Sequence, residues 1–281
     1  MTKLDDSVFK DELIRIVRVA HDEILAVYDT AFDIDRKDDD SPITEADRRA
    51  HDVIVSGLST LDPTIPIVSE ESDLPSFEIR STWSRYWLVD PLDGTKEFVK
   101  RNGEFTVNIA LIEHHEPTLG VVGKPTERAI YYGNSQRHLA QKITGSTNQL
   151  NISTRHVNTQ QIKSVQSHRR ADPTAERFFI YLEEEFGPIE RVYRGSSLKF
   201  LALAEGQADF YLQPGGTSEW DTAAAHAVLK AAGGEVLSLR GEPLRYNLRE
   251  SVLNTPFIAI ADVKTTTWTQ RLRHHLAIFN G

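Results

Sequence analysis

The hydrophobic period of this chain changes partway along its length, and this change constrains the fold more than any other feature. Between residues 65 and 132, short β-branched and aromatic runs follow one another, separated by Pro, Gly, Asp and Asn. Consecutive strands without intervening helices predict an antiparallel meander. The predicted strands cover residues 65–69, 86–89, 105–112, 119–122 and 129–132.

From about residue 162, strand-like and helix-like runs alternate, which is typical of an α/β arrangement. The polar segment 144–161 is the predicted junction, so we expect an α+β half over residues 1–155 and an α/β half over 156–281. The second half is predicted to contain strands at 164–167, 191–193, 208–212, 236–239 and 257–261, helices at 174–186, 197–204 and 222–232, and a terminal helix with Trp268, Leu272, Leu276 and Phe279.

The first sixty residues predict two amphipathic helices. Apolar residues recur at spacings of three and four from about residue 7 to residue 28. The acidic stretch 33–40 interrupts this pattern, and we interpret most of it as a solvated loop. Thr44, with Asp47 three positions later, is typical of a helix N-cap, and apolar residues on one face continue to Leu61.

Composition excludes several classes of function. The chain has 32 basic and 41 acidic residues, a net charge of −9, and its basic residues are scattered. A surface for polymeric nucleic acid or anionic lipid needs clustered basic residues, so we expect neither partner. Cysteine is absent, which removes disulfides and thiolate metal ligands and fits a reducing cytoplasm. The apolar runs are far shorter than the roughly 20 residues that span a bilayer, and the N-terminus lacks the apolar core of a signal peptide.

Three acidic clusters follow strand-like or glycine-rich runs. Glu70 and Glu71 follow one apolar run, Asp90 and Asp93 follow the next, and Asp221 follows a turn rich in glycine. The ends of neighbouring strands can bring such side chains together, where like charges would repel one another. A divalent cation would offset this repulsion, and a set of oxygen ligands favours Mg²⁺ or Mn²⁺ over Zn²⁺.

Each cluster also has a purely structural explanation. Asp93 before Gly94 suits a hairpin turn, Thr44 and Asp47 suit a capping box, and Asp221 suits a helix N-cap. All of these explanations would have to hold together for the metal site to be absent. We therefore favour the metal site.

Two long motifs resemble a known family. DPLDGT at 90–95 and WDTAA at 220–224 resemble the paired signatures of the inositol monophosphatase superfamily of Mg²⁺-dependent, lithium-sensitive phosphatases. The wider strings at 41–47, 69–71, 87–108, 195–200 and 204–206 resemble its CysQ-type 3'(2'),5'-bisphosphate nucleotidases. The resemblance covers nearly the whole chain and is poorest between about 134 and 190 and in the last twenty residues.

The resemblance implies a layered αβαβα sandwich with two or three Mg²⁺ per site, for which Mn²⁺ is a possible substitute. Glu70, Asp90 and the carbonyl of Leu92 would hold one ion, and Asp90, Asp93 and Asp221 a second. Two ions roughly 3.5–4 Å apart can stabilise both the attacking and the leaving oxygen of a phosphoryl displacement.

The same resemblance assigns catalytic roles. Thr95 and Asp47 would orient and deprotonate the attacking water, with Glu71 positioning that water from the side. The backbone N–H groups of Gly94 and Thr95 would bind phosphate oxygens.

Substrate contacts are expected from both halves of the chain. Ser196, Ser197 and Lys199 would bind a second phosphate. Ser167 and His168 align with a pair that contacts substrate in relatives, although a surface position explains His168 equally well. The full predicted substrate-binding set is Leu92, Asp93, Gly94, Thr95, Ser167, His168, Ser196, Ser197, Lys199 and Asp221.

These expectations favour a nucleotidase that converts adenosine 3',5'-bisphosphate to AMP and phosphate. We expect a cytoplasmic monomer or homodimer linked to sulfate assimilation, with attachment to the inner membrane face as an open alternative. A phosphatase of inositol or sugar phosphates is the first functional alternative. A non-catalytic nucleotide or metal sensor is the second, and it is disfavoured because every motif position is intact.

Overall fold

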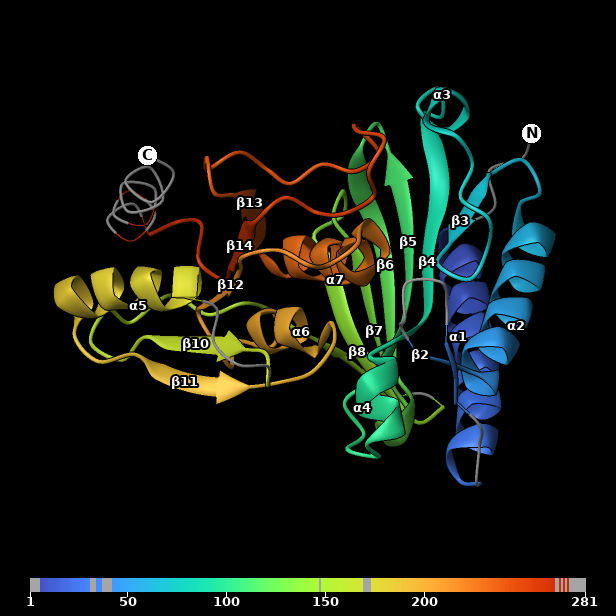
Figure 1. Ribbon diagram of the computed structural model, residues 1–281, viewed down its shortest axis with the longest axis horizontal. Helices are drawn as coiled ribbons and strands as arrows, with labels where there is room; N and C mark the ends of the chain where they lie inside the picture. The colour runs from blue at the N-terminus through green and yellow to red at the C-terminus, as the bar shows by residue number, and fades with distance from the viewer. Residues whose placement is uncertain are drawn as a thin grey trace.

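The chain folds into five layers in the order helix, sheet, helix, sheet, helix (Figure 1). The computed structural model describes residues 6–30, 34–36, 42–146, 148–168 and 173–265, together with residues 268, 270 and 272. Its architecture is the layered αβαβα sandwich that the sequence predicts. No helix within these residues combines the length and the apolar character needed to cross a bilayer.

The first layer consists of α1 (Asp6–Tyr28) and α2 (Glu45–Leu61). Thr44 is the N-cap of α2, as predicted, and forms a capping box with Asp47. The prediction of a loop for the acidic stretch is wrong at three residues, because β1 (Ile34–Arg36) pairs antiparallel with β2 (Pro42–Thr44). The other positions of that stretch lie outside the described residues.

The first sheet has seven strands in sequential order: β3 (Ile67–Ser69), β4 (Arg85–Asp93), β5 (Thr106–Glu113), β6 (Glu116–Lys124), β7 (Ala129–Asn134), β8 (Leu139–Thr144) and β9 (Asn148–Asn151). The meander from β4 onward is antiparallel, as predicted, whereas β3 and β4 are parallel. The short helices α3 (Phe77–Arg80), α4 (Thr95–Val99) and η1 (Pro125–Glu127) lie in its connections.

Strands β4 to β7 of this sheet are buried on both faces, toward which successive side chains point in turn. Trp87 and Val89 of β4 pack with α1 and α2, whereas Tyr86 and Leu88 pack with the middle helices. Because both of their faces are covered, these four central strands contain long apolar runs in place of an alternating polar face.

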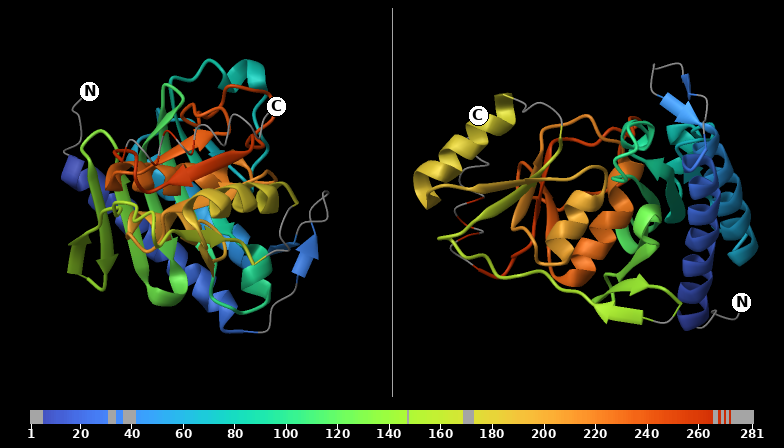
Figure 2. Two further views of the ribbon diagram at one scale, coloured as in Figure 1. Left: turned by 90° about the vertical axis from the view of Figure 1, so that its left-hand side faces the viewer. Right: turned by 90° about the horizontal axis from the view of Figure 1, so that it is seen from below.

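The second sheet has the order β11 (Glu190–Tyr193), β10 (Lys163–Gln166), β12 (Phe210–Gln213), β14 (Phe257–Ile260) and β13 (Glu235–Ser238). It is parallel through β11, β10 and β12 and antiparallel beyond β12. α5 (Pro173–Phe186) covers its outer face (Figure 2). Trp268 and Leu272 of the predicted terminal helix pack into this outer core, whereas Leu276 and Phe279 lie outside the described residues.

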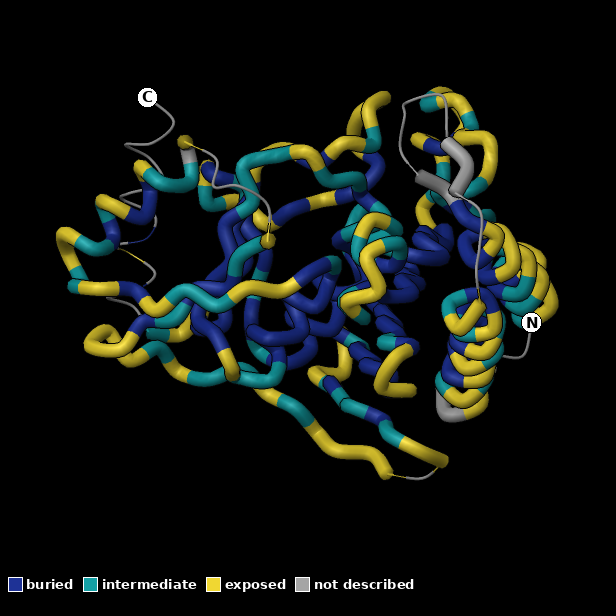
Figure 3. Tube along the Cα trace, turned by 60° about the horizontal axis from the view of Figure 1, so that its bottom comes forward, coloured by how far each residue is buried: buried dark blue, intermediate teal, exposed yellow. Residues whose placement is uncertain are grey.

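The middle layer, α6 (Leu198–Ala204) and α7 (Glu219–Ala232), joins the two sheets through one continuous core. Most of α7 is buried (Figure 3). It packs closely on the first sheet, since a Cβ atom on Gly133 would lie 2.4 Å from the Cα of Val228. The sheets follow the predicted halves 1–155 and 156–281, and that division of the chain into domains stays a prediction.

Candidate active site

Three carboxylates from different elements converge where the two halves meet. Glu70 follows β3, Asp90 lies in β4, and Asp221 lies in the first turn of α7. Each offers one oxygen, and these oxygens all lie within 4.8 Å of one another. Because β3 and β4 are parallel with Ser69 opposite Val89, residues 70 and 90 emerge side by side.

Burial makes this cluster electrostatically unfavourable without a counter-charge. Desolvation raises the pKa of Asp90 well above its ordinary value, and the nearby carboxylates of Glu70, Asp93 and Asp221 raise it further. Desolvation also raises the pKa of Asp221 well above its ordinary value and that of Asp93 to about 6, although the Lys199 ammonium opposes both shifts. A cluster of mutually repelling carboxylate oxygens that opens into a cleft suits a hard divalent cation, so the residues present fit Mg²⁺.

Asp93 lies beside this trio and is held by the second half of the chain. Its Oδ2 accepts the backbone N–H of Ser197 at 2.8 Å and lies 3.4 Å from the Thr106 hydroxyl. Leu92 belongs to the same turn: its N–H donates to Asp90 Oδ1 at 3.0 Å, and its carbonyl accepts the Thr95 hydroxyl at 3.4 Å.

Asp47 takes part in the capping box of α2 and also contacts Thr95, the two alternatives that the sequence leaves open. Its Oδ2 accepts the backbone N–H and the hydroxyl of Thr44, at 2.8 and 2.6 Å, which completes the capping box. Its Oδ1 accepts the Thr95 hydroxyl at 3.3 Å. Burial raises the pKa of Asp47 to about 6, although the Thr44 hydrogen bonds oppose this shift, and the nearby charge of Glu71 raises the pKa further.

The turn after β4 begins α4 and is not a hairpin, which corrects the structural alternative for Asp93 and Gly94. Gly94 has φ of +96°, a left-handed conformation that favours glycine. A Cβ atom there would lie 2.2 Å from the Ser196 hydroxyl oxygen. Thr95 is the first residue of α4, so its N–H has no acceptor within the helix.

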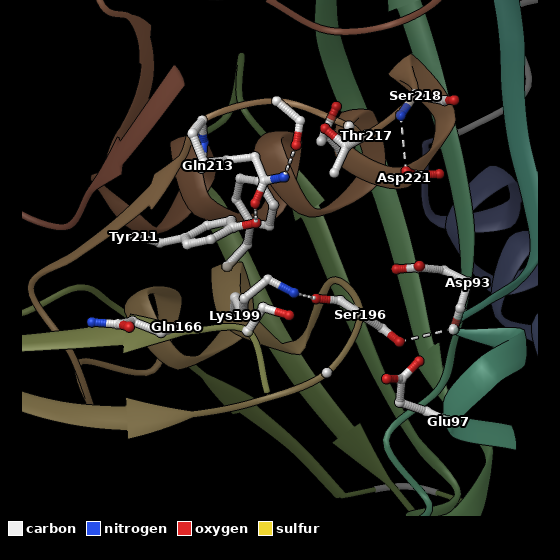
Figure 4. Close-up of a pocket in the computed structure, with 18 of the residues that line it drawn as sticks. Asp93, Glu97, Gln166, Ser196, Lys199, Tyr211, Gln213, Thr217, Ser218 and Asp221 are labelled. Carbon is white, nitrogen blue, oxygen red and sulfur yellow. Dashed lines mark hydrogen bonds between the residues drawn. The ribbon is translucent and has the colours of Figure 1, made fainter. Parts of the chain in front are cut away.

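A cleft of about 440 Å³ begins at Glu70, Asp93 and Asp221 and continues past Ser196 and Lys199 (Figure 4). Its far wall comes from residues to which the sequence analysis assigned no substrate contact, although it predicted the elements that carry them and the glycine-rich turn before Asp221. The residues of that wall are Gln166, Phe179, Tyr211, Gln213, Gly215, Gly216, Thr217 and Trp220.

The predicted substrate residues divide into two groups. Asp93, Gly94, Thr95, Ser167, Ser196, Lys199 and Asp221 line the cleft. Leu92, Ser197 and His168 are not in its lining. Ser197 is buried, its N–H donates to Asp93, and its hydroxyl contacts Asn108 Oδ1 at 2.9 Å. The structure therefore places Ser197 behind Asp93, whereas the sequence suggested a contact with phosphate.

His168 and Lys199 both have protein partners. His168 Nε2 lies 2.6 Å from Glu104 Oε2, and its ring stacks on Tyr193 with centroids 6.0 Å apart. The Lys199 ammonium donates to the Ser196 carbonyl at 2.6 Å and lies 5.3 Å from the centre of the Tyr211 ring.

A layered αβαβα fold that converges carboxylates on a cleft defines a class of metal-dependent phosphatases, and the sequence matches the model of one family in that class. Residues 5–275 match the inositol monophosphatase family, and the chain belongs to it.

Within this family the chain is similar to bisphosphate nucleotidases. It is 47% identical over 249 residues to the 3'(2'),5'-bisphosphate nucleotidase CysQ of Salmonella typhimurium, a match that covers 88% of this chain and 97% of the relative. Identity to the CysQ of Escherichia coli is 46% over the same length and coverage.

Solved structures show the same relationship. CysQ from Bacteroides thetaiotaomicron superposes with a TM-score of 0.78 at 36% identity and covers 89% of this chain and 96% of that protein. An inositol monophosphatase from Zymomonas mobilis superposes with a TM-score of 0.75 at 21% identity, over 99% of this chain and 100% of that protein. This second match shows the shared fold alone.

Proposed function

We propose that this chain is a Mg²⁺-dependent 3'(2'),5'-bisphosphate nucleotidase that hydrolyses adenosine 3',5'-bisphosphate to AMP and phosphate. The observation that carries this proposal is the convergence of Glu70, Asp90 and Asp221 at the end of a cleft, with Asp90 buried and the other two in the cleft lining. It occurs in a chain that matches relatives named as such nucleotidases over 97% of their length.

The carboxylate cluster would hold the metal. Glu70, Asp90 and Asp221 offer oxygens to a shared position, and Asp93 and the carbonyl of Leu92 lie in the adjoining turn. When bound, Mg²⁺ supplies positive charge that polarises the phosphate and lowers the pKa of water. We expect two or three ions per site, with Mn²⁺ as a functional substitute.

Thr95 and Asp47 would remove the proton of the attacking water. The Thr95 hydroxyl donates to Asp47 Oδ1, so Thr95 can accept a proton from water while passing its own proton to Asp47. A carboxylate whose pKa is about 6 is a better proton acceptor near neutral pH than an ordinary aspartate. The N–H groups of Gly94 and Thr95 would hold the phosphate oxygens while this transfer occurs.

The rest of the cleft would select the substrate. Lys199, 8% exposed, lies along the cleft from the carboxylates and supplies the positive charge that a second phosphate needs. Trp220 is the partly exposed aromatic side chain of the lining and provides apolar surface suited to a nucleoside, whereas Phe179 and Tyr211 are 2% exposed and support the wall from behind. We propose that the enzyme acts in the cytoplasm, or attached to the inner membrane face, as a monomer or homodimer in a salvage step linked to sulfate assimilation.

The decisive measurement is phosphate release from adenosine 3',5'-bisphosphate with Mg²⁺, with a chelator, and with Mg²⁺ plus lithium. We expect turnover only with Mg²⁺ and inhibition by lithium. Inositol 1-phosphate and a sugar bisphosphate serve as comparison substrates, and an equal or greater kcat/KM on either would contradict the proposal. Tight nucleotide binding with no turnover on any substrate would identify a sensor instead.

A further inference from the structure

Glu104 connects the two halves of the molecule directly behind the cleft. It lies in the loop that precedes β5, beside the first sheet. Its Oε2 accepts the backbone N–H of Gly195 at 2.8 Å and lies 2.6 Å from His168 Nε2. Its backbone carbonyl accepts the Ser196 hydroxyl at 2.7 Å. One residue of the first half therefore contacts two separate segments of the second half.

Both of these segments form the wall of the cleft. Gly195, Ser196 and Lys199 line it in one segment, and Ser167, the neighbour of His168, lines it in the other. Glu104 itself is not part of the lining. The packing leaves little freedom, because a Cβ atom on Gly195 would lie 2.8 Å from the Glu104 carbonyl oxygen.

The segment proposed to bind the second phosphate also contacts the metal-binding turn through Asp93. The Ser196 hydroxyl contacts the carbonyl of Asp93 at 2.9 Å, and the Ser197 N–H reaches the Asp93 carboxylate. These contacts fix Ser196 and Ser197, and the Glu104 carboxylate fixes Gly195, the residue before them. Residues of the first half therefore hold three successive positions of the segment that leads to Lys199.

We propose that Glu104 is a positioning residue that sets the separation between the catalytic turn (Asp93, Gly94 and Thr95) and the second-phosphate contacts, and thereby the preference for bisphosphates over monophosphates. This inference rests on the proposed nucleotidase function. The two phosphates of one nucleoside bisphosphate lie at a limited range of separations, so only a substrate that contacts both ends of the cleft is sensitive to this distance. A monophosphate that contacts the catalytic turn alone is not.

The test compares adenosine 3',5'-bisphosphate with adenosine 3'-monophosphate, which lacks the 5'-phosphate. For Glu104→Ala we expect KM for the bisphosphate to rise about tenfold or more, because displaced contacts to the second phosphate bind the substrate less tightly. We expect kcat/KM for the monophosphate to stay within about threefold of the wild type, because the catalytic turn is unchanged. Glu104→Gln keeps an acceptor oxygen for Gly195 and should recover much of the bisphosphate preference.

Glu205 provides a matched control. It also joins the halves, since it accepts a hydrogen bond from Lys142 at 2.8 Å and lies 3.3 Å from the Tyr131 hydroxyl, and it is not in the cleft lining. Glu205→Ala should lower thermal stability and leave the ratio of the two kcat/KM values unchanged. Should Glu104→Ala fail to fold, Glu104→Asp, which withdraws the carboxylate by one methylene, takes its place with the same expected direction.

Two results would overturn the inference. One is a substrate ratio for Glu104→Ala within about twofold of the wild type, and the other is an equal loss on both substrates. Either result, obtained beside a wild-type enzyme that prefers the bisphosphate, refutes the role of Glu104 and leaves the proposed function standing. A wild-type enzyme without that preference refutes the proposed function itself.

Discussion

Asp47 and Asp221 each hold the start of a helix and also face the active site. Asp47 caps α2 with Oδ2 while Oδ1 accepts the Thr95 hydroxyl. Asp221 accepts the Ser218 N–H through Oδ2 in the capping box of α7 and offers an oxygen to the carboxylate cluster. Because a helix start fixes its backbone, these capping contacts also fix where the carboxylates point.

The contact between Thr95 and Asp47 predicts a selective effect of Thr95→Ala. Removing the hydroxyl interrupts the proposed proton transfer and leaves the carboxylate cluster intact, so kcat should fall about 100-fold or more, in the range typical of general acid–base catalysis. Titration calorimetry should still show Mg²⁺ binding. Thr95→Ser is the control, because it keeps the hydroxyl and should retain most of the activity.

A loss of the Mg²⁺ signal in Thr95→Ala would assign Thr95 a role in metal binding instead. Equal activity in wild type and Thr95→Ala would remove Thr95 from the reaction.

At the residue scale, the sequence predicts which carboxylates come together, but it does not predict the partners of Ser197 and Glu104. Strand ends and helix starts have local signals, which is why the sequence alone groups Glu70, Asp90 and Asp221. Ser197 and Glu104 have no such signal, because the burial of one and the partners of the other depend on how the two halves pack.

At the scale of elements, the position of α7 decides whether the site exists. α7 lies against the first sheet, and its first turn carries Asp221 toward the ends of β3 and β4. The helix approaches closely because alanines dominate its buried face and glycines lie opposite it in the sheet. At Gly120, an added Cβ atom would lie 2.1 Å from the carbonyl oxygen of Ala224.

Gly120→Ala should therefore destabilise the protein and disturb the site together. The obstructing atom belongs to the helix backbone, so α7 must shift, and we expect a loss of about 1–3 kcal/mol in the free energy of unfolding. Because Asp221 moves with α7, Mg²⁺ affinity should fall as well. Denaturant unfolding and Mg²⁺ titration measure the two effects, and a variant with wild-type values in both would contradict the close packing of α7 on the sheet.

Element boundaries follow sequence signals where side chains set them. Thr44 predicts the start of α2, and the amphipathic pattern places α5 within one residue of its observed start. The sequence analysis does not predict β1, β2, β8 or β9, and for β9 the physical reason is clear. It is an exposed edge strand of three polar residues and Leu150, and pairing through the backbone leaves no hydrophobic pattern to detect.

At the scale of the whole molecule, the site is a junction, so metal binding is coupled to the association of the two halves. Glu70 and Asp90 belong to the first sheet and Asp221 to the helix layer that joins the sheets. Part of the net charge of −9 is concentrated there. Bound Mg²⁺ would reverse the local sign, which allows an acidic protein to attract an anionic substrate.

This coupling predicts that Mg²⁺ stabilises the protein more strongly as pH rises from about 5 to 8. Burial raises the pKa of Asp90 and Asp221 well above the ordinary value of 3.8 and that of Asp47 and Asp93 to about 6. The metal-free folded state thus keeps protons that the unfolded chain has released, and it loses stability as pH rises through these values. Mg²⁺ binds the deprotonated cluster and removes this penalty.

The measurement is the difference in Tm with Mg²⁺ and with chelator at each pH. Comparing the two Tm values at the same pH cancels the contribution of His21 to stability. Burial lowers the pKa of His21 to about 4, so its contribution to stability increases as pH rises toward 6.5. A difference that is constant from pH 5 to 8 would contradict the coupling.

Asp93→Asn tests the same coupling by removing one charge from the junction. With fewer like charges beside Asp90 and Asp221, the metal-free variant should be as stable as the wild type or more stable at pH 8, and its Mg²⁺-induced rise in Tm should be smaller. Activity at ordinary Mg²⁺ should be abolished, because the lost charge belongs to the metal-binding turn. Asp52→Asn is the control, since this exposed carboxylate on α2 should change neither quantity. An active Asp93→Asn enzyme would show that the cluster binds its metal without Asp93.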